Sequence, residues 1–117
     1  STSAETRLPL RWVAILHGRV RASLAASGGV ATGRDAAKLI LAGADVTMMC
    51  SALLRDGVGH LAVVRDELVR VMESKDYASV AEMRGVLSQK SCPEPAAFER
   101  ANYMKALQSY GKTATRE

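Results

Sequence analysis

Two junctions in this chain, each between an apolar segment and a predicted helix, carry residues suited to binding an anion through the backbone. The first junction covers residues 27–30 and contains Gly28 and Gly29, and the second contains Cys50 and Ser51. Glycine after a strand lets backbone N–H groups face a ligand without an intervening Cβ atom, and a helix N-terminus adds unpaired N–H groups. The pattern favours a phosphate monoester as the ligand, although two ordinary turns would explain the same residues.

The elements that position these junctions form a predicted βαβ unit. Apolar residues occupy 22–26 and 46–50, and a helix is expected between them at 33–42. Parallel neighbours need such a crossover, because a tight hairpin cannot connect them. The second segment lacks hydrophobic–polar alternation, which predicts a strand covered on both faces and a buried Cys50. Two parallel strands cannot bury both faces alone, so the unit is expected to belong to something larger.

The helix at 33–42 has clear start and stop signals. Thr32 and Asp35 form a T-x-x-D start, in which Thr32 caps a free backbone N–H and Asp35 lies near the positive end of the helix dipole. Gly43 is suited to terminate the helix. Further helices are predicted at 9–18, at 96–110 and, as a short turn, at 51–54. A longer amphipathic helix is predicted at 60–75, with Leu61, Val64, Leu68 and Val71 facing inward. Another helix is expected to begin at the S-x-x-E capping box formed by Ser79 and Glu82.

Composition excludes several classes of protein. The 117 residues carry a net charge of +4, but the basic residues are dispersed and the aromatic residues number one Trp, three Tyr and one Phe. This pattern does not favour nucleic-acid binding. No apolar run reaches about 20 residues, so no membrane contact is expected, and the cytoplasm is the default location. Two cysteines make no disulfide framework. Because Met48 is the first methionine, the chain is expected to be trimmed or part of a longer product.

Other chemistry is less favoured by the sequence. A Ser51–His60–Asp56 triad lacks a nucleophile elbow, and His17 and His60 lack further metal ligands at a suitable spacing. Arg34 and Arg55 could reach a phosphate, or they could be surface charges near helix starts. Trp12 is expected to be a packing residue.

Residues 9–89 resemble the C-terminal barrel portion of the dihydroorotate dehydrogenases. The resemblance lies in ASGGVATGRDAAKLILAGAD, VTMMCSALLRDGVGHL and DELVRVMESKDYASVAEMRG, and most clearly in the run from Glu73 to Gly85. It implies an FMN-dependent TIM (β/α)₈ barrel that oxidises dihydroorotate in pyrimidine biosynthesis, of which this chain would hold the last two strands and their helices. Residues 1–8 are expected from their composition to be a disordered N-terminus, and residues 90–117 to be a helical extension that lies outside the barrel elements of the resemblance.

The same resemblance implies which residues bind the cofactor. Gly28 and Gly29 would hold the FMN phosphate after strand seven, and Cys50 and Ser51 would hold it after strand eight. The family usually has glycine followed by threonine or serine where this chain has Cys50-Ser51. Its catalytic base, flavin-contacting lysine and orotate-binding asparagines come from earlier strands, so this chain is expected to supply no catalytic residue. The expected partner is the remainder of the barrel or a second copy in a homo-oligomer; the alternative is a self-associating α/β module without activity.

Overall fold

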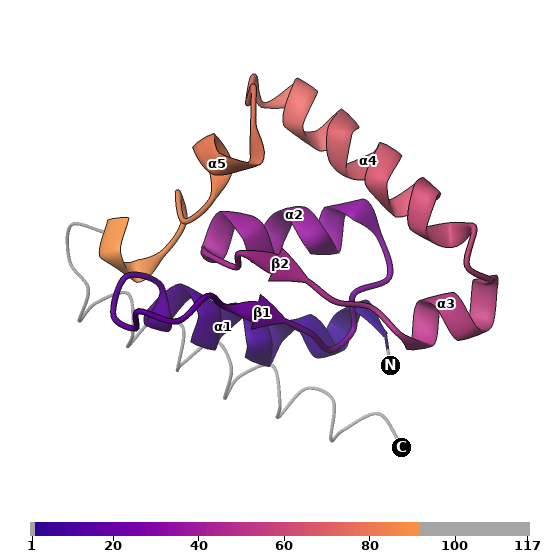
Figure 1. The fold of residues 1–117 in the computed structure, drawn as a ribbon, viewed down its shortest axis with the longest axis horizontal. Coiled ribbons are helices and arrows are strands. Elements are labelled where there is room, and N and C mark those ends of the chain that lie inside the picture. The colour runs from indigo at the N-terminus through magenta and orange to yellow at the C-terminus, as the bar shows by residue number, and fades with distance from the viewer. Residues whose placement is uncertain (1, 92–117) are drawn as a thin grey trace, which may run out of the picture.

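The computed structural model describes residues 2–91 of the chain, which fold as an α/β unit rich in helices (Figure 1). The cysteine at position 92 and the predicted helix at 96–110 lie outside the described residues. The elements, with the two 3₁₀ helices labelled η1 and η2, are η1 Ser3–Thr6, α1 Arg7–Leu16, β1 Ala25–Ala26, α2 Gly33–Ala42, β2 Val46–Thr47, α3 Ser51–Asp56, α4 His60–Ser74, α5 Val80–Met83 and η2 Gln89–Ser91.

The predicted βαβ unit is present. Strands β1 and β2 are parallel, with Ala25 opposite Val46 and Ala26 opposite Thr47, and α2 forms the crossover between them. Both strands are shorter than the predicted segments 22–26 and 46–50. A strand is defined by its hydrogen bonds to a neighbouring strand. Among the described residues, β1 and β2 have only each other as neighbours, so both strands are short.

One face of this small sheet is covered by helices and the other is open. Strand β1 contacts α1, and β2 contacts α2. On the opposite face Val46 is 54% exposed and Met48 is 55% exposed. The expectation of a second strand covered on both faces is therefore wrong for the described residues, because no second layer lies over the Val46 side. The open face presents apolar side chains to solvent.

Helix α2 has the predicted boundaries, and its N-terminus is fastened by a capping box. The Thr32 hydroxyl accepts a hydrogen bond from the Asp35 amide at 3.1 Å, and Asp35 Oδ2 accepts one from the Thr32 amide at 3.1 Å. Asp35 Oδ2 also accepts from Ser3 Oγ at 2.6 Å and from the Ala31 amide at 3.1 Å. Burial alone raises the pKa of the Asp35 carboxyl, but these hydrogen bonds outweigh it and hold that pKa below its usual value of 3.8.

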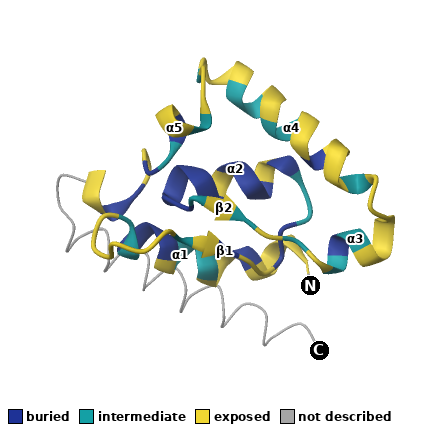
Figure 2. Cartoon of the chain, viewed as in Figure 1, coloured by how far each residue is buried: buried dark blue, intermediate teal, exposed yellow. Residues whose placement is uncertain are grey.

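Helix α2 is also the centre of the packing. Most of its residues are buried, whereas α4 exposes its outer side (Figure 2). Leu39, fully buried, packs into a cluster with Val13 and Ala14 of α1. Ile40 and Leu41 pack with Met83 and, on α4, Leu68. The predicted inward stripe of α4 is confirmed at Val64, which is buried, and at Leu68 and Val71, which pack against α2, whereas Leu61 is 52% exposed.

The N-terminal segment is ordered, contrary to the prediction from the sequence. Residues 1–8 were predicted to be disordered, yet Ser3–Thr6 form η1, and α1 begins at Arg7, two residues before the predicted helix. Thr6 is buried, and its hydroxyl donates to the Ser3 carbonyl at 2.7 Å. The polar side chains of this segment bond to Asp35 and to the backbone, which a composition-based expectation of disorder overlooks. No helix among residues 2–91 is long and apolar enough to cross a membrane.

Candidate functional site

The two predicted junctions lie at the same end of the sheet. Because β1 and β2 are parallel and in register, the residues that follow Ala26 and those that follow Thr47 leave the sheet at one edge. The Met48 amide donates to the Ala26 carbonyl at 2.8 Å, so the chains are still joined as they leave the strands. The parallel register thus brings the junction containing Gly28 and Gly29 to the same sheet edge as the junction containing Cys50 and Ser51.

Both glycines of the first junction have positive φ angles, which residues with a side chain rarely adopt. The φ angles are 104° at Gly28 and 76° at Gly29. A Cβ atom at Gly28 would meet only Pro9 Cγ at 3.5 Å, an ordinary contact, whereas one at Gly29 would lie 2.2 Å from the Thr2 carbonyl oxygen. Gly28 is exposed and Gly29 is buried. Gly29 is therefore also required by the packing of the N-terminal segment, and Gly28 is the glycine that faces open space.

The backbone amides of the first junction, at Gly28, Gly29 and Val30, have no hydrogen-bond partner among the described residues, and of the three residues Gly28 is the exposed one. The neighbouring N-terminus of α2 is different, because its donors are used inside the protein. The Gly33 amide donates to Glu67 Oε2 at 3.1 Å, and the Asp35 amide donates to the Thr32 hydroxyl. Free donors in this loop are therefore concentrated at residues 28–30, directly after the strand.

The second junction forms the start of α3. Cys50 is the N-cap, with φ −135° and ψ −62°, and its side chain makes no capping hydrogen bond. The expectation that Cys50 is a buried strand residue is wrong, because the strand ends at Thr47 and Cys50 is exposed. Ala52 and Leu53 lie in the first turn, where amides have no partner within the helix. The junction therefore offers amides and an exposed thiol beside them.

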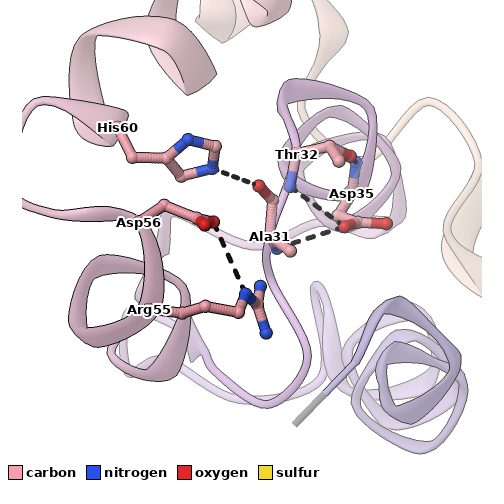
Figure 3. Close-up of polar contacts among 6 residues, drawn as sticks. All are labelled: Ala31, Thr32, Asp35, Arg55, Asp56 and His60. Carbon is pink, nitrogen blue, oxygen red and sulfur yellow. Dashed lines mark hydrogen bonds and ion pairs between the residues drawn. The ribbon is translucent and has the colours of Figure 1, made fainter.

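Figure 3 shows one polar contact from α4 to the loop that follows the first junction, and one ion pair within α3. His60 Nε2 donates to the Ala31 carbonyl at 2.7 Å, which ties the start of α4 to the loop that carries the glycines. Arg55 Nε lies 3.5 Å from Asp56 Oδ2 in an exposed ion pair. These partners also exclude the Ser51–His60–Asp56 triad, because Asp56 faces Arg55 and His60 faces a carbonyl.

Sequence reasoning missed two residues that support this loop. His60 and Glu67 reach it from α4, across 29 and 34 positions of the chain, respectively. The only local signal was the T-x-x-D box, which predicted the contacts of Asp35 and Thr32 but not the contacts to α4. Trp12, expected to be a packing residue, is 49% exposed, and the guanidinium carbon of Arg11 lies 5.7 Å from its ring centroid.

An open cavity of about 200 Å³ lies at the other end of the sheet, where the strands begin. His17, Arg21, Leu24 and Asp45 are among its lining residues. Asp45 already accepts from the Leu24 amide at 2.7 Å and faces Arg84 Nε at 3.6 Å. This cavity is separate from the two junctions and contributes none of their donors. Among residues 2–91, no group of three or more His, Cys, Asp or Glu could hold a metal ion.

Comparisons of this chain with known proteins identify several relatives. No family model matches the chain. The chain is 33% identical over 72 residues to dihydroorotate dehydrogenase (fumarate) of Kluyveromyces lactis, a match that covers 62% of this chain and 22% of that protein. It is 36% identical over 63 residues to the chloroplastic dihydropyrimidine dehydrogenase (NADP(+)) of Arabidopsis thaliana, which covers 54% of this chain and 15% of that protein.

A solved structure agrees with these matches. The crystal structure of DHODH from Eimeria tenella in complex with ferulenol aligns with a TM-score of 0.54 and 30% identity, over 56% of this chain and 18% of that chain. The chain spans 22% or less of the length of these relatives. Over about half of its length, the chain is therefore dihydroorotate dehydrogenase-like.

Proposed function

We propose that this chain supplies the phosphate-binding amides of the FMN site in a dihydroorotate dehydrogenase-like oxidoreductase built on a TIM barrel. The observation that carries the proposal is the meeting of two junctions at one sheet edge, with unengaged amides at residues 28–30. Loops after the last two strands, together with a short extra helix, form a recurrent phosphate site in such barrels. Strand β2 is followed by a short helix of this kind, α3.

The residues present fit a phosphate group. Gly28 leaves space where a side chain would otherwise stand, and the N–H groups of residues 28–30 are not engaged by other described residues. Cys50 and Ser51 would hold the phosphate from the second side, with the first-turn amides of α3. When bound, FMN supplies the hydride acceptor for oxidation of a dihydropyrimidine. The role of this chain is to bind and orient the cofactor through its phosphate, whereas the proton-removing base belongs to other strands.

The proposal also accounts for the open face of the sheet. Val46 and Met48 are about half exposed on the side without helices, and in a closed barrel that side faces the packed interior. The outer sides of β1 and β2, which have no strand beside them in the described residues, would pair with further strands of the barrel. The proposed partner is therefore the remainder of a barrel.

The phosphate requirement is tested by comparing FMN with riboflavin, which lacks the phosphate, in titrations of the 117-residue chain. FMN should bind at least about tenfold more tightly, because a hydrogen bond to a charged group contributes about 1.5–3 kcal/mol. Flavin fluorescence measures both affinities. Equal affinities would show that the phosphate is not held by this chain and would contradict the proposal.

A second candidate function has one observation in its favour. The exposed Val46 and Met48, next to unpaired strand edges, would also suit self-association of a chain without catalytic activity. A chain that binds neither flavin and sediments as a well-defined dimer would support this candidate. A chain that selects FMN over riboflavin would favour the first proposal.

A further inference from the structure

His60, the first residue of α4, contacts the loop between β1 and α2 through its side chain (Figure 3). Its Nε2 lies 2.7 Å from the Ala31 carbonyl oxygen, at the short end of the usual range for such hydrogen bonds. Because a carbonyl only accepts, Nε2 carries the hydrogen in this contact. Both residues are half-buried. The bond therefore fixes a defined point of the loop against α4.

The peptide group between Ala31 and Thr32 is held from two sides. Its carbonyl accepts from His60, and its N–H, that of Thr32, donates to Asp35 Oδ2 at 3.1 Å. The C=O and N–H of a trans peptide point in opposite directions, so the two partners restrain the group from opposite sides. The preceding peptide group is also fixed, because the Ala31 N–H donates to the same carboxylate oxygen at 3.1 Å.

The unengaged amides of residues 28–30 directly precede these fixed peptide groups. Gly28 and Gly29 leave the backbone on that side with more conformational freedom than other residues would. An anion is bound by several N–H groups only when they point to one place, and ordering them beforehand lowers the cost of binding. The loop therefore depends on restraints at its α2 side.

Helix α4 provides a firm base for such a restraint. It lies so close to the start of α2 that a Cβ atom on Gly33 would be 2.4 Å from Glu67 Cβ. The Gly33 amide donates to Glu67 Oε2 at 3.1 Å, and the His60 amide donates to the Gly57 carbonyl at 3.1 Å. His60 thus projects from a helix end whose place beside α2 is set by packing and by hydrogen bonds.

We propose that His60 is a positioning residue of the phosphate site. By holding the Ala31 carbonyl, it orients the amides of residues 28–30 toward the FMN phosphate without touching the flavin itself. This inference rests on the proposed function, and it adds a side chain from α4 to a site otherwise made of backbone groups.

The test compares the FMN and riboflavin affinities of His60→Leu and His60→Gln in the 117-residue chain. His60→Leu removes the donor, so FMN should bind about threefold to tenfold more weakly, which is the change expected from one hydrogen bond. Riboflavin, which has no phosphate, should bind as it does to the unmodified chain. His60→Gln keeps an N–H donor at a similar reach and should restore most of the preference for FMN.

His17→Leu is the matched control. It removes another hydrogen bond from a histidine to a carbonyl, because His17 Nδ1 lies 3.2 Å from the Gly43 carbonyl oxygen at the far end of α2. The ratio of FMN to riboflavin affinity should stay that of the unmodified chain. Far-UV circular dichroism checks that all three variants remain folded.

Three results would overturn the role of His60: an unchanged affinity ratio in His60→Leu, equal losses for both flavins, or a His60→Gln variant as weak as His60→Leu. An unmodified chain without a preference for FMN would instead contradict the proposed function. The positioning of the loop is then judged without flavin, by ¹⁵N relaxation of the amides of residues 28–30. These amides should be more mobile in His60→Leu than in His60→Gln, and equal mobility would contradict the inference.

Discussion

The Gly28→Asp variant is expected to bind FMN at least about tenfold more weakly than the unmodified chain, because its carboxylate would lie where the proposal places the phosphate. Gly28 is exposed, and a Cβ atom there would contact only Pro9. The new side chain therefore has room to enter the site, and its negative charge would repel a phosphate. Fluorescence titration with FMN measures the loss.

Gly57→Asp is the matched control for this variant. Gly57 also has a positive φ, 87°, and nothing lies within 4 Å of a Cβ atom built on it. Both variants thus add one charge and similar backbone strain, but Gly57 follows α3 at its C-terminal end, away from the two junctions. Gly57→Asp should keep the FMN affinity of the unmodified chain. Equal affinity losses in the two variants would attribute the effect to general destabilisation and would contradict the assigned phosphate site.

The Gly33→Ala variant is expected to lose about 3 kcal/mol of unfolding free energy through overpacking. A Cβ atom at Gly33 would lie 2.4 Å from Glu67 Cβ and from the Leu68 amide nitrogen, and 2.6 Å from the Val64 carbonyl oxygen. Two of these atoms belong to the backbone of α4, so relief requires α2 and α4 to move apart. Urea unfolding followed by circular dichroism measures the change.

The Gly59→Ala variant is the control for Gly33→Ala. Gly59 has φ −59°, which alanine also adopts, and no atom lies within 4 Å of its built Cβ. Its unfolding free energy should change by no more than about 0.5 kcal/mol. A Gly33→Ala variant as stable as Gly59→Ala would mean that α2 and α4 do not pack as described. The loop that carries the phosphate site would then lose its support from α4.

The parts of the fold that could be predicted are those with local chemical signals. The boundaries of α2 match because Thr32, Asp35 and Gly43 act on the residues next to them. The parallel βαβ connection was also predicted, because only a crossover explains the spacing of the two apolar segments. The meeting of the two candidate junctions at one sheet edge follows from that connection.

The features that could not be predicted depend on contacts between distant segments. The N-terminal segment is ordered because Ser3 bonds to Asp35, 32 positions away. Cys50 was placed inside the second strand by its apolar neighbours, but strand length depends on a pairing partner that the sequence alone does not show. His60 was recognised as a helix start, whereas its bond to the Ala31 carbonyl depends on the packing of α4 beside the loop.

The most direct test of the central claim is to map which backbone amides respond to FMN by ¹H–¹⁵N NMR of the 117-residue chain. The amide signals of residues 28–30 and 50–53 should shift with FMN and not with riboflavin. Signals of Gly33 and Asp35, whose amides already donate to Glu67 and Thr32, should shift less. Shifts confined to the α2 N-terminus or to the cavity around His17 and Asp45, or no shifts at all, would contradict that claim.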